Sequence, residues 1–233
     1  YYNRAAQRGA EVLIAYKHDS SAFGAALADV ERRQLADAQP FPWQTDTAIA
    51  KTSWCYTEQN DYKKPWSILC DLVDVVAKNG TMLLNVGPRA DGTISPEDTR
   101  ILEAIGDWLK ANGEAIYGSR PWRHAQEGPT RQAAGQFTDG QDKAYTAEDF
   151  RFLSNHGNIY AAAMRCPANE SLLIHSLGRK AHTADSPFFG IIDGVEPLGF
   201  DMIPRWEQRE DGLWIDTTDI RSENPVIFRI TCR

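Results

Sequence analysis

The chain has 233 residues, of which 42% are hydrophobic and 24% are charged, and these proportions are typical of folded globular proteins. The 32 acidic residues outweigh the 25 basic ones and give a formal net charge of −7. The apolar fraction argues against disorder. The negative surface would repel phosphate backbones, which argues against a nucleic-acid partner.

The chain starts at Tyr1 rather than at a methionine, and residues 1–9 have the composition of a helix that is already under way. We therefore expect the sequence to be part of a longer chain, with any targeting peptide encoded upstream. No stretch approaches the roughly 18 consecutive apolar residues that cross a bilayer, so no membrane span is predicted.

The cysteines are widely spaced and include no Cys-x-x-Cys pair, which is unlike a zinc site or a dithiol redox site. The histidines also lack the spacing of metal ligands. The sequence therefore predicts no metal and no cofactor. We expect all four thiols to be small buried apolar groups: Cys55, Cys70, Cys166 and Cys232.

Two short strands are predicted in the first fifty residues. Residues 12–16 form an apolar run of strand length, and residues 41–47 form a second run in which Pro42 stands at the start. Residues 20–39 are polar and rich in alanine without a clean period. We expect a long loop with some helix there.

Residues 66–78 predict a helix, because their apolar side chains recur at helical spacing. Gly80 is expected to end this helix in a left-handed conformation. Residues 82–84 are apolar on consecutive positions, which predicts a strand buried on both faces. A helix that leads into a buried strand is typical of a parallel α/β architecture.

A further helix is predicted to begin at Ser95, where a capping side chain precedes Pro96 and two acidic residues, and to end at Gly113. Beyond Trp122 the helical period disappears, and turn residues separate short runs. Asp211-Gly212 is the dipeptide best suited to a tight hairpin. We therefore expect a second, antiparallel β domain, a sandwich, with a boundary near Trp122.

Several of these segments resemble a known family. The chain has Leu-Leu-Asn-Val-Gly-Pro at 83–88, Asp-Gly-Thr-Ile at 91–94 and Asn-Gly-Glu-Ala-Ile-Tyr at 112–117. This order is similar to the closing segment of the catalytic barrel of glycoside hydrolase family 29, the α-L-fucosidases. Trp-Gln-Thr-Asp-Thr at 43–47 and Ser-Trp-Cys-Tyr at 53–56 resemble a further family motif, which has Gly in place of the Cys.

The resemblance implies that residues 1–122 form the C-terminal portion of a (β/α)8 barrel, a partial barrel of the TIM type, and that residues 123–233 form the C-terminal β-sandwich. It also implies retaining hydrolysis of terminal α-L-fucose, with a fucosylated oligosaccharide or glycoconjugate as the substrate. A secreted or periplasmic location would follow, and the oligomeric state stays open.

In a parallel barrel the reactive groups lie at the carboxyl ends of the strands. The resemblance implies that Glu31, in Asp-Val-Glu-Arg, is the general acid/base. From the residues alone, an acid flanked by arginines is more often a solvated ion pair. Asp29 is the rival in the same turn and could equally orient the loop. Lys17 and His18 follow the first strand, where the resemblance implies a basic group near the sugar; an ordinary strand-end cation is the alternative.

Trp43 and Trp54 lie at predicted strand ends, where a flat ring can receive the apolar face of a deoxy sugar. Packing in the core is the alternative for both, and we favour Trp43 as the ring that faces the sugar. Gln44 and Asp46 are expected to serve the internal hydrogen bonding of the barrel.

The resemblance places the nucleophilic aspartate on a strand upstream of this sequence, and no residue here matches it. We therefore expect the chain alone to be inactive. The alternative function is a non-catalytic carbohydrate-binding protein or an inactive fucosidase homologue, and the β domain could also serve only to support the barrel.

Overall fold

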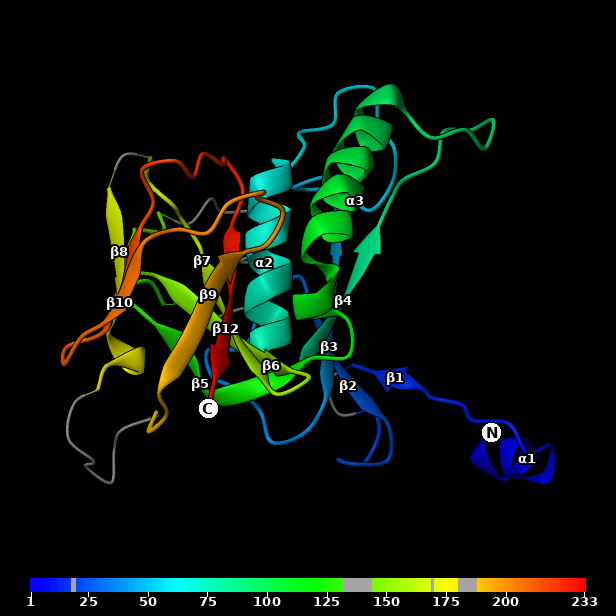
Figure 1. The fold of residues 1–233 in the computed structure, drawn as a ribbon. Coiled ribbons are helices and arrows are strands. Elements are labelled where there is room, and N and C mark those ends of the chain that lie inside the picture. Colours follow the sequence, from blue (N-terminus) through cyan, green and yellow to red (C-terminus); the bar gives the residue numbers. More distant parts are fainter. Residues whose placement is uncertain (18–19, 132–143, 169, 180–187) are drawn as a thin grey trace.

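The computed structural model describes the chain apart from residues 18–19, 132–143, 169 and 180–187. Its first half contains a parallel sheet in the order β1-β2-β3-β4, and the two longer helices lie on one side of this sheet (Figure 1). The strands are β1 (Ala15–Tyr16), β2 (Leu27–Glu31), β3 (Trp43–Ala48) and β4 (Gly80–Asn85), and the helices are α1 (Tyr2–Gln7), α2 (Pro65–Ala77) and α3 (Pro96–Ile116).

The prediction for residues 20–39 was wrong, because β2 lies inside this segment. Its sequence, Leu-Ala-Asp-Val-Glu, alternates apolar and acidic residues over only four positions, and β2 pairs in parallel with both β1 and β3. Partners distant in sequence therefore fix this strand. The predicted strand at 41–47 is confirmed as β3, and Pro42 lies just before it.

The two faces of the parallel sheet differ in character. Trp43 of β3 and Gly80 of β4 lie on the face that packs against α2, where Met82 and Leu84 also join the hydrophobic core. The opposite face is open, and Leu83 is 55% exposed there. The expectation that β4 is buried on both faces is therefore wrong for this structure.

Gly80 does not end α2 as expected. Asn79 takes the left-handed conformation instead, with φ of 70°, and Gly80 is the first residue of β4. A Cβ on Gly80 would lie 2.6 Å from the Trp43 ring and 2.7 Å from Val75. The glycine is needed because the β3 indole and α2 pack directly on the strand backbone.

The start of α3 is confirmed, because Ser95 Oγ accepts a hydrogen bond from the Asp98 backbone N–H at 3.1 Å and Pro96 is the first helical residue. Its predicted end is wrong. The helix continues through Gly113 to Ile116, and the Gly113 position leaves space for the Tyr117 ring, which a Cβ would approach to 2.9 Å.

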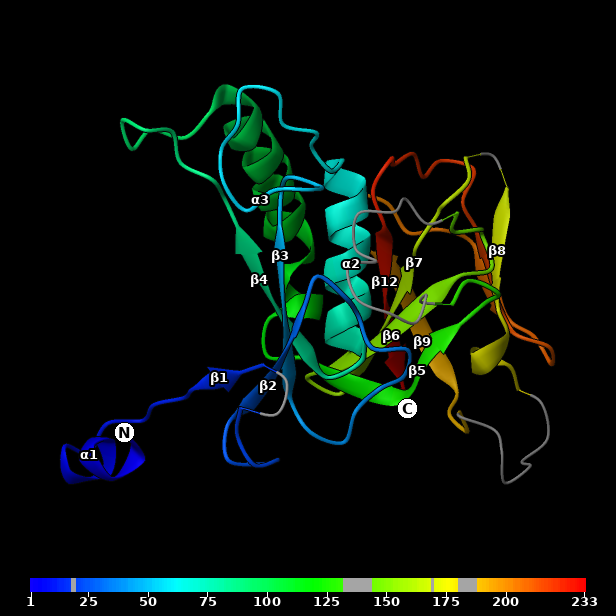
Figure 2. The same ribbon diagram turned by 180° about the vertical axis from the view of Figure 1, so that it is seen from behind.

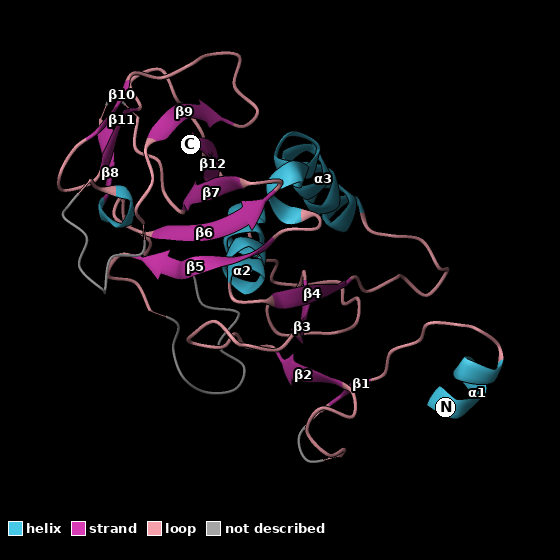
Figure 3. Ribbon diagram, turned by 60° about the horizontal axis from the view of Figure 1, so that its bottom comes forward, coloured by secondary structure: helices cyan, strands magenta, loops and turns pink. Residues whose placement is uncertain are grey.

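The second half forms two antiparallel sheets that share a hydrophobic core (Figure 3). One has the strand order β5-β6-β7-β12-β9 and the other β10-β11-β8. The strands are β5 (Arg120–Glu127), β6 (Phe150–Asn155), β7 (Asn158–Ala163), β8 (Ser171–Ile174), β9 (Ile192–Pro197), β10 (Trp206–Gln208), β11 (Leu213–Asp216) and β12 (Val226–Cys232), and a short 3₁₀ helix, η1, covers His175–Leu177. The hairpin predicted at Asp211-Gly212 is confirmed as the β10–β11 connection. Trp122, the expected boundary, lies inside β5.

Helices α2 and α3 connect the two halves. Figures 1 and 2 show α2 between the parallel sheet and the five-stranded antiparallel sheet. Its core residues, among them Leu69 and Val73, share one hydrophobic cluster with Leu153 and Tyr160 of the antiparallel sheet. Helix α2 is thus covered by the parallel sheet on one side and by the antiparallel sheet on the other.

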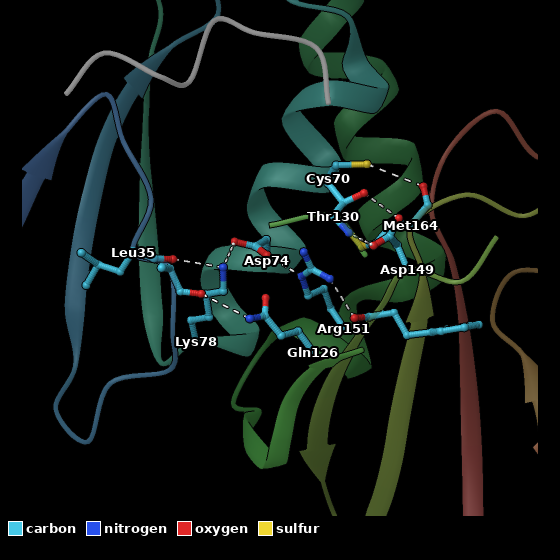
Figure 4. A network of polar contacts seen from close by, with 11 residues as sticks. Leu35, Cys70, Asp74, Lys78, Gln126, Thr130, Asp149, Arg151 and Met164 are labelled. Atoms are coloured by element: carbon cyan, nitrogen blue, oxygen red, sulfur yellow. Dashed lines mark hydrogen bonds and ion pairs between the residues drawn. The ribbon is translucent and has the colours of Figure 1, made fainter. Parts of the chain in front are cut away.

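A buried polar network crosses the same boundary (Figure 4). Lys78, at the end of α2, donates to Asp74 at 2.7 Å and to the Leu35 carbonyl at 3.0 Å. Asp74 also pairs with Arg151 of β6, and all three side chains are completely buried. One network therefore joins a loop of the parallel sheet, α2 and the antiparallel sheet.

The expectation of four buried thiols is only partly right. Cys70 and Cys166 are buried and Cys232 is half-buried, but Cys55 is exposed. Cys55 lies in the connection between β3 and α2, outside both hydrophobic cores. Within the described ranges, none of the helices is both long enough and apolar enough to cross a membrane.

Candidate active site

A lysine and three acids meet on the open face of the parallel sheet. Lys17 follows β1, and its Nζ lies 2.9 Å from Glu31 Oε2, 2.5 Å from Asp46 Oδ2 and 3.9 Å from Asp29 Oδ2. Glu31 is the last residue of β2 and is in register with Asp46 of β3. The parallel pairing therefore places acids from two neighbouring strands around the ammonium group of a residue that follows a third strand.

The three carboxyl groups differ in their access to solvent. The side chain of Glu31 is 32% exposed, that of Asp46 is 15% exposed and that of Asp29 is 7% exposed. Of these acids, Glu31 is the one that a ligand or a water molecule reaches most readily. Asp29 Oδ1 and Asp46 Oδ1 are buried and have no hydrogen-bond partner among the described residues.

Burial and the neighbouring charge of Asp46 raise the pKa of Asp29 above its ordinary value. Burial works against the charge on Lys17, but hydrogen bonds to Asp46 and Glu31 raise its pKa overall. The ammonium therefore remains charged and compensates for part of the surrounding negative charge.

The residue after Glu31 anchors the neighbouring loop. Arg32 is 4% exposed, its φ is 46°, and its guanidinium donates to the carbonyls of Lys51 and Ser53, each at 2.8 Å. Its Cζ also lies 4.3 Å from the centre of the Trp54 ring. Sequence reasoning gave Arg32 no role, although its position directly after Glu31 in the motif was the available signal.

The carboxyl end of β4 contacts the same loop. Asn85 donates through Nδ2 to the Trp54 carbonyl at 2.7 Å. A Cβ on Gly87 would lie 2.4 Å from the Tyr56 backbone nitrogen, so only glycine permits this approach. Arg32 from one side and Asn85 and Gly87 from the other thus fix the loop beside Glu31.

The structure brings the candidate residues Glu31, Lys17 and Asp29 together, and it adds Asp46. Asp46 was expected only in internal hydrogen bonding, yet it makes the shorter contact to Lys17. Trp54 is half-buried beside Arg32. His18 lies outside the described residues.

The preference for Trp43 as the ring that faces the sugar is corrected. Its side chain is 0% exposed, and its indole N–H donates to the Lys78 carbonyl at 2.9 Å. Side chains alternate along a strand, and Trp43 points to the α2 side whereas Asp46 points to the open face. The ring therefore belongs to the core.

A parallel sheet with helices on one face and a cluster of acids around a lysine on the other defines an α/β protein with a candidate acid–base site. Residues 1–114 match the family model described as Alpha-L-fucosidase. This match covers just under half of the chain, and over this part the chain is similar to the α-L-fucosidase family.

Two curated relatives illustrate the similarity. The tissue α-L-fucosidase of Bos taurus is 44% identical over 88 residues, which are 36% of this chain and 19% of the relative. The plasma α-L-fucosidase of Homo sapiens is 38% identical over 138 residues, which are 58% of this chain and 26% of the relative. The chain thus spans only about a fifth to a quarter of the curated relatives that it matches.

Solved structures resemble the chain over more of its length. Alpha-L-fucosidase isoenzyme 1 from Paenibacillus thiaminolyticus superposes with a TM-score of 0.66 and 21% identity, over 89% of this chain and 45% of that one. The Thermotoga maritima α-fucosidase in complex with fucose superposes with a TM-score of 0.63 and 22% sequence identity. The superposition covers 84% of this chain and 41% of that one. At these identities the structural similarity shows the shared fold, which extends into the antiparallel sheets.

Proposed function

We propose that the chain carries the general acid/base of a retaining α-L-fucosidase, which removes terminal α-L-fucose from fucosylated oligosaccharides or glycoconjugates. The observation that carries the proposal is the placement of Glu31 and Asp46 around Lys17 on the open face of a sheet whose sequence matches the family model. Carboxyl groups at the ends of parallel strands are where barrel enzymes hold their reactive groups.

In this proposal, residues 1–122 are the later portion of a (β/α)8 barrel and residues 123–233 are a C-terminal β-sandwich. The strictly sequential parallel order β1-β2-β3-β4 supports the first part, because barrel strands follow one another in this way. The two antiparallel sheets that share one core support the second. The open face of the parallel sheet would then be the inside of the barrel.

Retaining hydrolysis needs one carboxyl group that moves a proton and a second that attacks the sugar, about 5 Å away. Glu31 would donate a proton to the leaving oxygen and later accept one from water, since it is the most exposed acid of the cluster. Lys17 contacts both Asp46 and Glu31 and would compensate part of the negative charge of the two carboxyl groups. The attacking aspartate is not assigned to any residue here.

Lys17 would also hold a sugar hydroxyl or the attacking carboxylate, and His18 is proposed as a further substrate-binding residue. Trp54 is the aromatic ring that remains available to the sugar, because Trp43 lies on the other face of the sheet.

The test is the release of fucose by the protein expressed from its full coding sequence. Changing Glu31→Gln should reduce kcat/KM by about 10²- to 10⁴-fold, which is the usual contribution of a positioned acid or base. Glu103→Gln on the exposed side of α3 is the matched control and should leave activity unchanged. Equal activity of the Glu31→Gln variant and the wild type would remove Glu31 from the mechanism.

The second candidate is a non-catalytic carbohydrate-binding protein or an inactive homologue. Titration of fucosylated oligosaccharides into the protein separates the two candidates. Binding without any release of fucose would favour the second, and release that depends on Glu31 would favour the first.

A further inference from the structure

An open cleft of about 810 Å³ lies between the start of α2 and the antiparallel sheets, away from the Lys17 cluster. Its lining includes Lys64 and Trp66 from the beginning of α2, Arg165 after β7, and Arg221 before β12. Glu223 is the one acid of the lining. A volume of this size lies within the range of small-molecule sites.

The charge of this cleft is opposite to that of the chain. Three cationic side chains against one carboxylate make the lining positive, in a protein with a formal net charge of −7. Among the described residues, the side chains of Lys64 and Arg165 have no hydrogen bond or ion pair. Arg221 does have a partner, so Lys64 and Arg165 are the cations available to an anion.

The other lining groups suit a sugar ring. Trp66 is half-buried and offers an apolar surface, with its far side held edge-on by Tyr145 at 6.2 Å between ring centres. Asn224 lines the cleft with an amide group that can bind sugar hydroxyls, whereas the Ser222 hydroxyl already donates to the Asn224 carbonyl at 2.9 Å. Cations beside an indole and neutral polar groups match a sugar that carries a negative charge.

The cleft also lies at a suitable end of the molecule. Figures 1 and 2 show the start of α2 and the segment that enters β12 at the same end as the carboxyl end of β4. Barrel active sites open at this end. A glycan whose terminal residue enters the proposed active site could therefore continue toward the cleft.

We propose that this cleft is a second glycan-binding site, which takes an acidic sugar residue, sulfated or carboxylated, through Lys64, Arg165 and Trp66. The inference rests on the proposed function for its substrate class. Binding at the cleft does not need hydrolysis, so the site can be tested without fucose and without activity.

The experiment titrates the full chain with three fucose-free ligands: N-acetyllactosamine, its 6-sulfated form and its sialylated form. The sulfated or the sialylated ligand should bind at least about tenfold more tightly than the neutral one, as expected for charge-assisted hydrogen bonds. The comparison of these two ligands shows whether the anion is a sulfate or a carboxylate. Affinity should fall as salt rises, because the contacts lie near the surface.

The double variant Lys64→Gln/Arg165→Gln should lose about tenfold or more in affinity for the acidic ligand. The matched control Arg100→Gln/Lys110→Gln removes the same charge from exposed positions of α3 and should bind as the wild type does. The proposal is overturned if neutral and acidic ligands bind equally, or if both double variants bind like the wild type. Loss of fucosidase activity in the Glu31 test would leave this binding result unaffected.

Discussion

Asp74 of α2 and Arg151 of β6 form an ion pair in which both side chains are completely buried, and Lys78 shares the same carboxylate (Figure 4). Arg151 also donates to the Phe150 carbonyl at 2.9 Å. The pair joins the helix that packs on the parallel sheet to the antiparallel sheet. Its removal should therefore weaken both halves of the molecule together.

Asp74→Asn should reduce the free energy of unfolding by about 3–5 kcal/mol, because Lys78 and Arg151 would remain buried without their counter-charge. Urea denaturation followed by tryptophan fluorescence measures this change. The matched control is Glu97→Gln, whose pair with Arg100 is exposed to solvent and should contribute little to the free energy of unfolding. Similar losses in the two variants would contradict the structural role of the buried pair.

Gly80→Ala should destabilise the protein by about 1–3 kcal/mol, because the new methyl group would overlap the Trp43 ring and Val75. Gly106→Ala is the control within α3, where a Cβ meets nothing within 4 Å. That substitution should stabilise the helix by about 0.5–1 kcal/mol. Thermal unfolding of both variants provides the comparison, and a stabilising Gly80→Ala would show that α2 packs on the sheet differently.

Cys55 should react with a thiol reagent in the folded protein, whereas Cys70 and Cys166 should react only after denaturation. Cys55 is exposed and the other two are buried. Burial also raises the pKa of Cys166 to about 11, which keeps it in the unreactive thiol form at neutral pH. Mass spectrometry of the labelled peptides over time gives the order in which the cysteines react. Equally fast labelling of Cys70 and Cys55 would contradict the placement of the hydrophobic core.

Asp29 should make stability fall as pH rises. Its pKa is raised in the folded state from an ordinary value of 3.8, so the folded protein holds this proton more tightly than the unfolded chain does. The stabilising contribution of Asp29 to the free energy of unfolding is therefore fully present below the ordinary pKa. It is lost as pH rises through the raised pKa. The difference in unfolding free energy between the wild type and Asp29→Asn should decrease over this interval.

Urea titrations of both proteins between about pH 3.5 and 7 test this sign. Asp91 supplies a control of the opposite sign, because hydrogen bonds from Thr93 lower its pKa. The contribution of Asp91 should be lost as pH falls. A difference for Asp29→Asn that grows with pH would show that Lys17, rather than burial, dominates the environment of Asp29.

Local patterns were enough to predict the helices and the tight hairpin. The helical spacing over residues 66–78, the cap at Ser95 and the Asp211-Gly212 turn are each properties of a few neighbouring residues. These elements appear where the sequence indicates. The end of α2 at Asn79 depends on the packing of Trp43, which is distant in sequence, on Gly80, and the end of α3 beyond Gly113 depends on how the Tyr117 ring folds back onto the helix.

The site itself could be predicted only in part. The family motif indicated Glu31, but β2 was missed, because its open face carries acids in place of the apolar side chains that mark a strand. Trp43 was assigned to the wrong face, and Asp46 was left out of the cluster. Both errors concern strand register, which is fixed by the pairing of β2, β3 and β4 and by the helix beneath them.

The pH dependence of kcat/KM for fucoside hydrolysis, measured for the wild type and Glu31→Gln, tests the central claim most directly. The wild type should show a bell-shaped profile whose alkaline limb reports the loss of the proton from the general acid. Glu31→Gln should lack this limb and retain only the low activity that other interactions support. An alkaline limb that persists unchanged in Glu31→Gln would contradict the assignment of Glu31 as the acid/base.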